Sequence, residues 1–209
     1  MSEERFVEVA DEPRHRPLLE NEFVRVFDFQ LRPGETTLYH RHNEDTFCVA
    51  IEPASIVDQP FGEEPVAEPI TWPAGIAWCR DYGSKPVIHR VTNSGGEVMR
   101  LIGAELRESP IPRSDHPLEA VAYELKYEDP RLRVYRLELA PGESTGVVAY
   151  DCSGLLVGVS PTCLSLRDGS RTWTQRIGSG DVHWLQGPME VEVTNTGASG
   201  FRAYLAEWL

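Results

Sequence analysis

The chain has 209 residues, of which 33 are acidic and 20 basic, giving a formal net charge of −13. This charge repels phosphate backbones and anionic lipid surfaces, so it argues against nucleic acid and membrane partners. No window contains the roughly 18 apolar residues of a membrane span, and the N-terminal stretch MSEERFVEVADEPRHR is charged. The four cysteines lie far apart without a CxxC pair, which favours reduced core thiols. We therefore expect a cytoplasmic protein.

The predicted elements are β-strands joined by turns. Residues 23–36 (FVRVFDFQLRPGET) alternate apolar and polar side chains and end in a Pro-Gly turn, and residues 131–144 (RLRVYRLELAPGES) do the same. Residues 93–97 (NSGGE) and 195–199 (NTGAS) form turns between later strands. No run has a convincing helical period, so several short strands in about 100 residues predict a small barrel or sandwich.

An internal repeat divides the chain into two halves. Residues 20–37 align with residues 128–145 at an offset of 108, with shared Arg, Val, Leu and Pro-Gly-Glu positions. Residues 91–106 align with residues 193–208 at an offset of 102, through VTNSGG and VTNTGA. This self-similarity predicts a tandem duplication of one structural unit.

The two copies are joined by a polar stretch with three prolines, residues 107–120 (RESPIPRSDHPLEA), which we interpret as the linker. We place the boundary near Ser109. The sequence thus predicts two packed β-barrels, residues 1–108 and residues 109–209.

A histidine doublet ends residues 34–42 (GETTLYHRH). Side chains alternate between the two faces of a strand, so His40 and His42 point the same way and can share one ion. His89, brought from a neighbouring strand, would complete three nitrogen ligands and leave coordination positions open. The same alternation predicts further inward-facing side chains at Leu38, Glu44, Thr46 and Cys48.

These residues resemble the motifs of the cupin superfamily. GETTLYHRH fits the first cupin motif, and the second appears in two pieces, PAG at 73–75 and HRVTN at 89–93. Together with the repeat, the resemblance covers nearly the whole chain. The chain therefore resembles a bicupin, a protein with two cupin barrels in tandem. This resemblance implies two jelly-roll β-barrels and a mononuclear divalent metal ion bound by His40, His42 and His89.

The sequence departs from the cupin pattern at two places. Gly75 and His89 are much farther apart than in the family motif, so we expect residues 76–86 (IAWCRDYGSKP) to bulge out before the strand of His89. The glutamate that usually follows the second histidine is missing, because Thr46 and Phe47 stand in its place.

Four other residues are candidates for catalysis or substrate binding. Glu44 is the only carboxylate in reach of the doublet, and it could be a displaced ligand, a general base or a rim residue. Thr46 shares the inward face, and Arg80 and Tyr82 lie in the expected insertion at the barrel mouth. We expect Thr46 to contact substrate, and Arg80 and Tyr82 are candidates for the same role, although the sequence favours an ordinary solvated loop for these two. The other histidines are assigned to the terminus, the linker and a turn edge: His15, His116 and His183.

The second copy lacks the metal ligands. His40, His42 and His89 align with Val148, Tyr150 and Val191. We therefore expect a C-terminal barrel without metal, which acts as a packing partner or an interface. Since the barrel forms there without the histidines, barrel stability does not explain their presence in the first copy.

The resemblance implies a family of dioxygenases, isomerases, decarboxylases, lyases and non-catalytic binding proteins. We expect a metal-dependent dioxygenase acting on a small organic substrate, with Fe(II) as the first choice and Mn, Ni or Zn as alternatives. A non-redox isomerase or lyase, and a small-ligand binding or sensing protein, are the other hypotheses. Exposed barrel strands also predict a homodimer.

Overall fold

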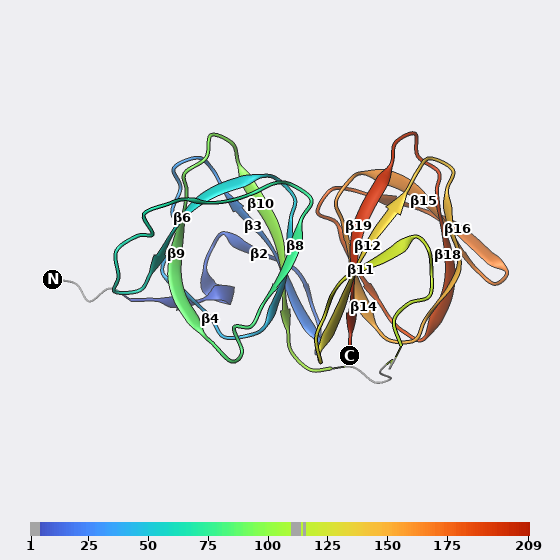
Figure 1. Ribbon diagram of the computed structural model, residues 1–209, viewed down its shortest axis with the longest axis horizontal. Helices are drawn as coiled ribbons and strands as arrows, with labels where there is room; N and C mark the ends of the chain where they lie inside the picture. The colour runs from blue at the N-terminus through green and yellow to red at the C-terminus, as the bar shows by residue number, and fades with distance from the viewer. Residues whose placement is uncertain (1–4, 110–113, 115) are drawn as a thin grey trace. The chain divides into compact units, whose positions relative to one another are not determined.

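The computed structural model describes residues 5–109, 114 and 116–209. The chain separates into two compact units, Met1–Glu108 and Ser109–Leu209 (Figure 1). Part of the predicted linker lies outside the described residues. Within the described part of the chain, no helix has the length and apolar character needed to cross a membrane.

The N-terminal unit consists of two five-stranded sheets. The first has the order β1-β4-β9-β6-β7, with strands Val7–Glu8, His40–His42, Val87–Asn93, Ala54–Pro60 and Ile70–Trp72. The second has the order β2-β3-β10-β5-β8, with strands His15–Glu20, Val24–Leu31, Met99–Leu106, Thr46–Ala50 and Ala77–Arg80. A short 3₁₀ turn, η1 (Val9–Asp11), connects β1 to β2.

The C-terminal unit repeats this arrangement, although no counterpart of β1 is found among its described residues. Its five-stranded sheet has the order β11-β12-β19-β14-β17, with strands Tyr123–Glu128, Leu132–Leu139, Phe201–Trp208, Gly154–Gly158 and Val182–Leu185. Its four-stranded sheet has the order β13-β18-β15-β16, with strands Ser144–Tyr150, Met189–Asn195, Thr162–Asp168 and Arg171–Ile177.

Strand register confirms the equivalences that the repeat predicts. His40 pairs with His89 across β4 and β9, and Val148 pairs with Val191 across β13 and β18. The two Pro-Gly turns also match, because Gly34 and Gly142 both have φ of 78°, a left-handed conformation that glycine adopts without steric cost. The prediction of two tandem β-barrels is confirmed.

The predicted bulge over residues 76–86 is wrong. Residues 77–80 of this segment form β8, which pairs with β5 in the second sheet, and only the short connection that follows is irregular. The chain then returns to the first sheet in β9. The long separation between Gly75 and His89 is therefore filled by a strand and a crossing between sheets.

Candidate metal centre

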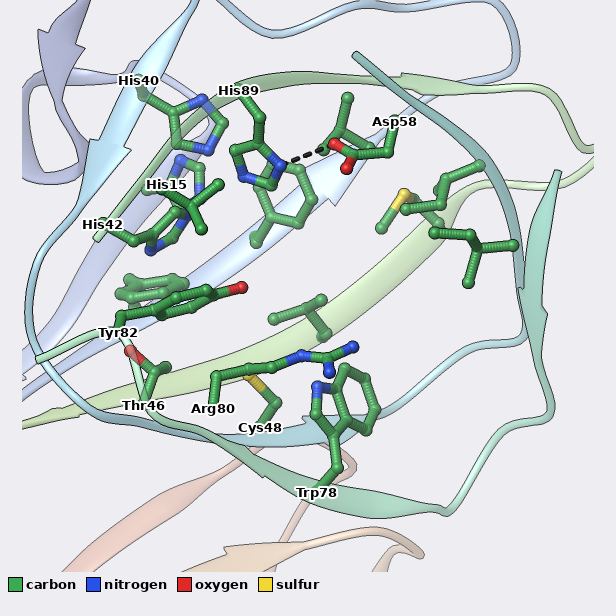
Figure 2. A pocket seen from close by; sticks show the side chains of 18 of the residues that line it. His15, His40, His42, Thr46, Cys48, Asp58, Trp78, Arg80, Tyr82 and His89 are labelled. Atoms are coloured by element: carbon green, nitrogen blue, oxygen red, sulfur yellow. Dashed lines mark hydrogen bonds and ion pairs between the residues drawn. The ribbon is translucent and has the colours of Figure 1, made fainter. Parts of the chain in front are cut away.

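A cavity of about 270 Å³ lies inside the N-terminal barrel (Figure 2). Much of its wall is apolar and comes from strands of both sheets, including Phe27, Phe29, Ile56, Trp72, Trp78, Val91, Met99 and Leu101. Its polar side chains include four histidines, His15, His40, His42 and His89. The apolar interior of the C-terminal barrel leaves a much smaller space of about 50 Å³.

The three predicted metal ligands meet in this cavity. His40 and His42 project from β4, and His89 lies opposite His40 on β9. The ring centres are 4.9 Å apart for His40 and His42, 4.8 Å for His40 and His89, and 5.3 Å for His42 and His89. With metal–nitrogen bonds of about 2.1 Å, imidazoles sharing one ion have ring centres about 4.5–5.5 Å apart at bond angles of about 90–110°, and up to roughly 6.4 Å apart at wider angles. The spacings of these rings are those expected of imidazoles around one ion.

Hydrogen bonds hold two of these rings by their Nδ1 atoms. His89 Nδ1 donates to Asp58 Oδ1 at 2.6 Å (Figure 2), and His40 Nδ1 donates to the carbonyl of Leu38 at 2.9 Å. Such bonds fix the tautomer that leaves Nε2 free for a metal. His89 Nε2 is buried without a hydrogen-bond partner, and so is His42 Nδ1. A bound ion would give His89 Nε2 the partner that it lacks.

Burial favours the neutral form of His40, His42 and His15, which is the form that binds metal. Burial, followed by the nearby His15 and His89 rings, lowers the pKa of His40 to about 3. Burial, followed by the His40 and His89 rings, lowers the pKa of His42 well below its ordinary value. Burial also lowers the pKa of His15, although Glu12 acts in the opposite direction.

His15 was assigned to the terminus from the sequence, and this interpretation is wrong. It begins β2, is 6% exposed, and lines the cavity. The ligand atoms of His15, His40 and His42 all lie within 4.8 Å of one another. Little in the sequence indicates that His15 belongs to the site, because residues 15–19 share little with the aligned residues 123–127 of the second copy.

The residues predicted to bind substrate also line the cavity. Tyr82 stacks on His42 with 4.8 Å between ring centres, and Arg80 lines the same cavity. Burial raises the pKa of Tyr82 to about 12, so its hydroxyl stays protonated. Thr46 is buried, and its hydroxyl donates to the carbonyl of Glu44 at 2.9 Å. Their predicted contact with substrate stays a prediction.

Glu44 and Leu38 do not line the cavity, contrary to the alternation argument. Leu38 is 48% exposed, and Glu44 lies in the turn between β4 and β5. Strand alternation does not extend across these positions, because β4 comprises only His40–His42. By contrast, Thr46 and Cys48 of β5 face the cavity as expected. Of the three roles considered for Glu44, this placement favours the rim residue.

The same site in the C-terminal barrel is closed by non-ligating side chains. Val148, Tyr150 and Val191 are all buried there, between 3% and 4% exposed. The hydroxyl of Tyr150 is hydrogen-bonded to that of Tyr123 at 2.6 Å. This barrel therefore has a packed interior where the N-terminal barrel has histidines around a cavity.

No protein-family model matches this sequence, and no curated protein matches it. Solved structures do resemble it. Salicylate 1,2-dioxygenase from Pseudaminobacter salicylatoxidans is 13% identical, with a TM-score of 0.62 over 95% of this chain and 77% of that one. Oxalate decarboxylase from Lactobacillus farciminis is 12% identical, with a TM-score of 0.62 over 96% and 84%. A cupin 2 conserved barrel domain protein from Leptotrichia buccalis is 10% identical, with a TM-score of 0.54 over 92% and 87%.

The chain therefore has the cupin fold, with two barrels in tandem as in a bicupin. The all-β fold class is confirmed, and the resemblance read from the sequence is confirmed as a likeness of fold. The likeness to these structures concerns the fold, and the chemistry of this chain has to be argued from its own cavity.

Proposed function

We propose that the N-terminal barrel is a mononuclear metal centre in which His40, His42 and His89 hold a divalent ion. The observation that carries this proposal is the convergence of three imidazoles from β4 and β9 on one cavity. Two of the rings are oriented by Nδ1 hydrogen bonds, as ligating histidines usually are. The replacement of all three by buried Val148, Tyr150 and Val191 in the other barrel agrees with a role other than packing.

The cavity favours a small organic anion as substrate. Three neutral ligands leave the ion its full positive charge, and the Arg80 guanidinium adds another at the cavity wall. Phe27 and Trp78 provide apolar surface for a carbon skeleton and exclude water from it. The protonated hydroxyl of Tyr82 can donate a hydrogen bond to a substrate oxygen.

The reaction we propose is the oxygenation of such a substrate by a dioxygenase. A divalent ion at this place would supply Lewis acidity and, if it is iron, electrons for oxygen chemistry. Fe(II) is the proposed ion, with Mn, Ni or Zn as alternatives. The salicylate dioxygenase of similar fold supports this reaction class, and the similar oxalate decarboxylase supports a non-redox lyase as the second candidate. A binding protein without catalysis is less favoured, because His89 faces the cavity.

The test is metal analysis of protein purified without oxygen, followed by an oxygen-uptake screen with small organic acids. We expect about one divalent ion per chain in the wild type and a strong loss in His42→Ala and His89→Ala. Tyr150→Phe is the matched control, since it changes the equivalent position of the second barrel and should leave metal content unchanged.

Circular dichroism establishes whether each variant is folded. Folded histidine variants with wild-type metal content would overturn the three-histidine site. Stoichiometric iron without oxygen uptake on any substrate tested, together with substrate consumption in the absence of oxygen, would favour the lyase.

A further inference from the structure

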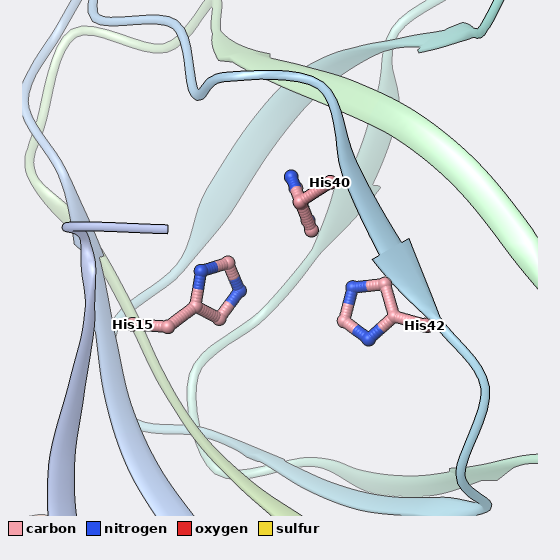
Figure 3. A group of neighbouring side chains, drawn as sticks. All are labelled: His15, His40 and His42. Atoms are coloured by element: carbon pink, nitrogen blue, oxygen red, sulfur yellow. The ribbon is translucent and has the colours of Figure 1, made fainter. Parts of the chain in front are cut away.

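His15 places a fourth imidazole beside the predicted ligands, and Figure 3 shows it next to two of them, His40 and His42. Its ring centre is 4.8 Å from that of His40 and 6.0 Å from that of His42. The first separation equals that between His40 and His89, two rings that we propose share an ion. His15 comes from β2 in the second sheet, so it reaches the cavity from a different wall than His40, His42 and His89.

Glu12 fixes the orientation of the His15 ring. His15 Nδ1 donates to Glu12 Oε2 at 3.0 Å, and the carboxylate also accepts hydrogen bonds from the backbone N–H groups of Arg14 and Leu38, at 2.7 and 3.3 Å. Glu12 is only 1% exposed. His89 has the same kind of carboxylate support on Nδ1 from the partly buried Asp58, and at His15 this support leaves Nε2 for the cavity.

The second barrel shows that a histidine is not needed at this position for folding. His15 pairs with Phe29 across β2 and β3, and Tyr123 pairs with Leu137 across β11 and β12, so Tyr123 is its equivalent. Tyr123 is buried and bonded to Tyr150, the equivalent of His42. The four positions therefore change together: a cluster of histidines in one barrel corresponds to two valines and a hydrogen-bonded tyrosine pair in the other.

We infer that His15 is a fourth protein ligand of the proposed ion, an inference that rests on the proposed metal centre. The ion is then held by four neutral nitrogens. Glu12 and Asp58 balance its charge through the Nδ1 hydrogen bonds of two of the rings, without occupying coordination positions. An all-imidazole set selects divalent transition metals such as Fe, Ni, Cu or Zn over Mg and Ca, which prefer oxygen ligands.

The ring of His15 also packs against Phe29, with centres 4.4 Å apart, and against Phe27 at 4.8 Å. A test therefore has to separate packing from coordination. His15→Phe keeps an aromatic ring on these neighbours and removes both nitrogens. Glu12→Gln keeps the shape of the supporting side chain and removes its charge. His183→Phe is the control, because His183 is a partly buried histidine of the second barrel.

Zinc affinity by chelator competition and X-ray absorption of the zinc-loaded protein are the two measurements. We expect absorption data that fit four imidazoles in the wild type and three in His15→Phe. The dissociation constant should rise more than tenfold in His15→Phe and about 10- to 100-fold in Glu12→Gln, and stay unchanged in His183→Phe.

Three imidazoles in the wild-type spectrum would overturn the inference without any variant being needed. So would a folded His15→Phe protein with wild-type affinity and an unchanged spectrum. Absence of stoichiometric zinc from the wild type would instead remove the metal centre itself, and the fourth ligand with it.

Discussion

The side chains of Asn93 and Asn195 make the same pair of hydrogen bonds in the two barrels. Asn93 Nδ2 donates to the carbonyls of Leu31 and Glu97 at 2.9 and 2.8 Å. Asn195 Nδ2 donates to those of Leu139 and Ser199 at 3.0 and 2.8 Å. Both side chains are almost completely buried. The duplicated unit thus keeps its structural asparagine in both copies, whereas the four histidines of the cavity occur only in the N-terminal copy.

Replacement of Asn93 or Asn195 by alanine should destabilise the protein by about 1–3 kcal/mol, because it removes one buried and one part-buried hydrogen bond. Urea unfolding of each variant measures the change, and Asn43→Ala, at an exposed position, is the control. Unchanged stability in both buried variants would contradict the structural role.

Asp58→Asn should weaken metal binding about 10- to 100-fold, since it removes the negative charge that His89 Nδ1 contacts at 2.6 Å. Equilibrium metal titration of the folded variant checks this. Asp168→Asn, an exposed substitution in the second barrel, should have wild-type affinity. Equal affinities for the two variants would show that Asp58 does not support the site.

The metal-free protein should lose stability as the pH falls from about 7.5 to about 5. An unfolded histidine has a pKa of about 6.5, whereas burial lowers the pKa of His40 to about 3 and that of His42 well below its ordinary value. Between these values the unfolded chain binds more protons than the folded one, so acid favours unfolding by up to about 1.4 kcal/mol per pH unit for each such histidine.

Comparison with His42→Phe isolates this contribution. Burial raises the pKa of the Glu105 and Glu207 carboxyl groups, but these titrate in both proteins and cancel in the difference. Urea unfolding at several pH values should therefore give a shallower pH dependence for the variant. Parallel curves for the two proteins would mean that His42 is not held neutral by the fold.

Much of the fold could be predicted from the sequence. The alternation of apolar and polar residues and the Pro-Gly turns are local patterns, and the repeat is found by comparing the sequence with itself. The doublet His40 and His42 and its loss at Val148 and Tyr150 could be read in the same way. His15 could not, because its role depends on β2 reaching the cavity from the other sheet, which is a tertiary relationship. Glu44 was misplaced because alternation holds only within a continuous strand, and β4 ends at His42.

The last prediction concerns Gly103, which lets an aromatic ring form the cavity wall. A Cβ atom at this position of β10 would lie 2.3 Å from Cζ of Phe27, whose ring packs against His15. Gly103→Ala should therefore force Phe27 toward the cavity, destabilise the protein by about 1–3 kcal/mol and reduce metal affinity. Gly96→Ala is the matched control, since nothing lies within 4 Å of its added Cβ. Thermal unfolding and metal titration of both variants measure the two effects. Wild-type stability and affinity in Gly103→Ala would mean that the Phe27 ring can move without disturbing His15, and this prediction would be wrong.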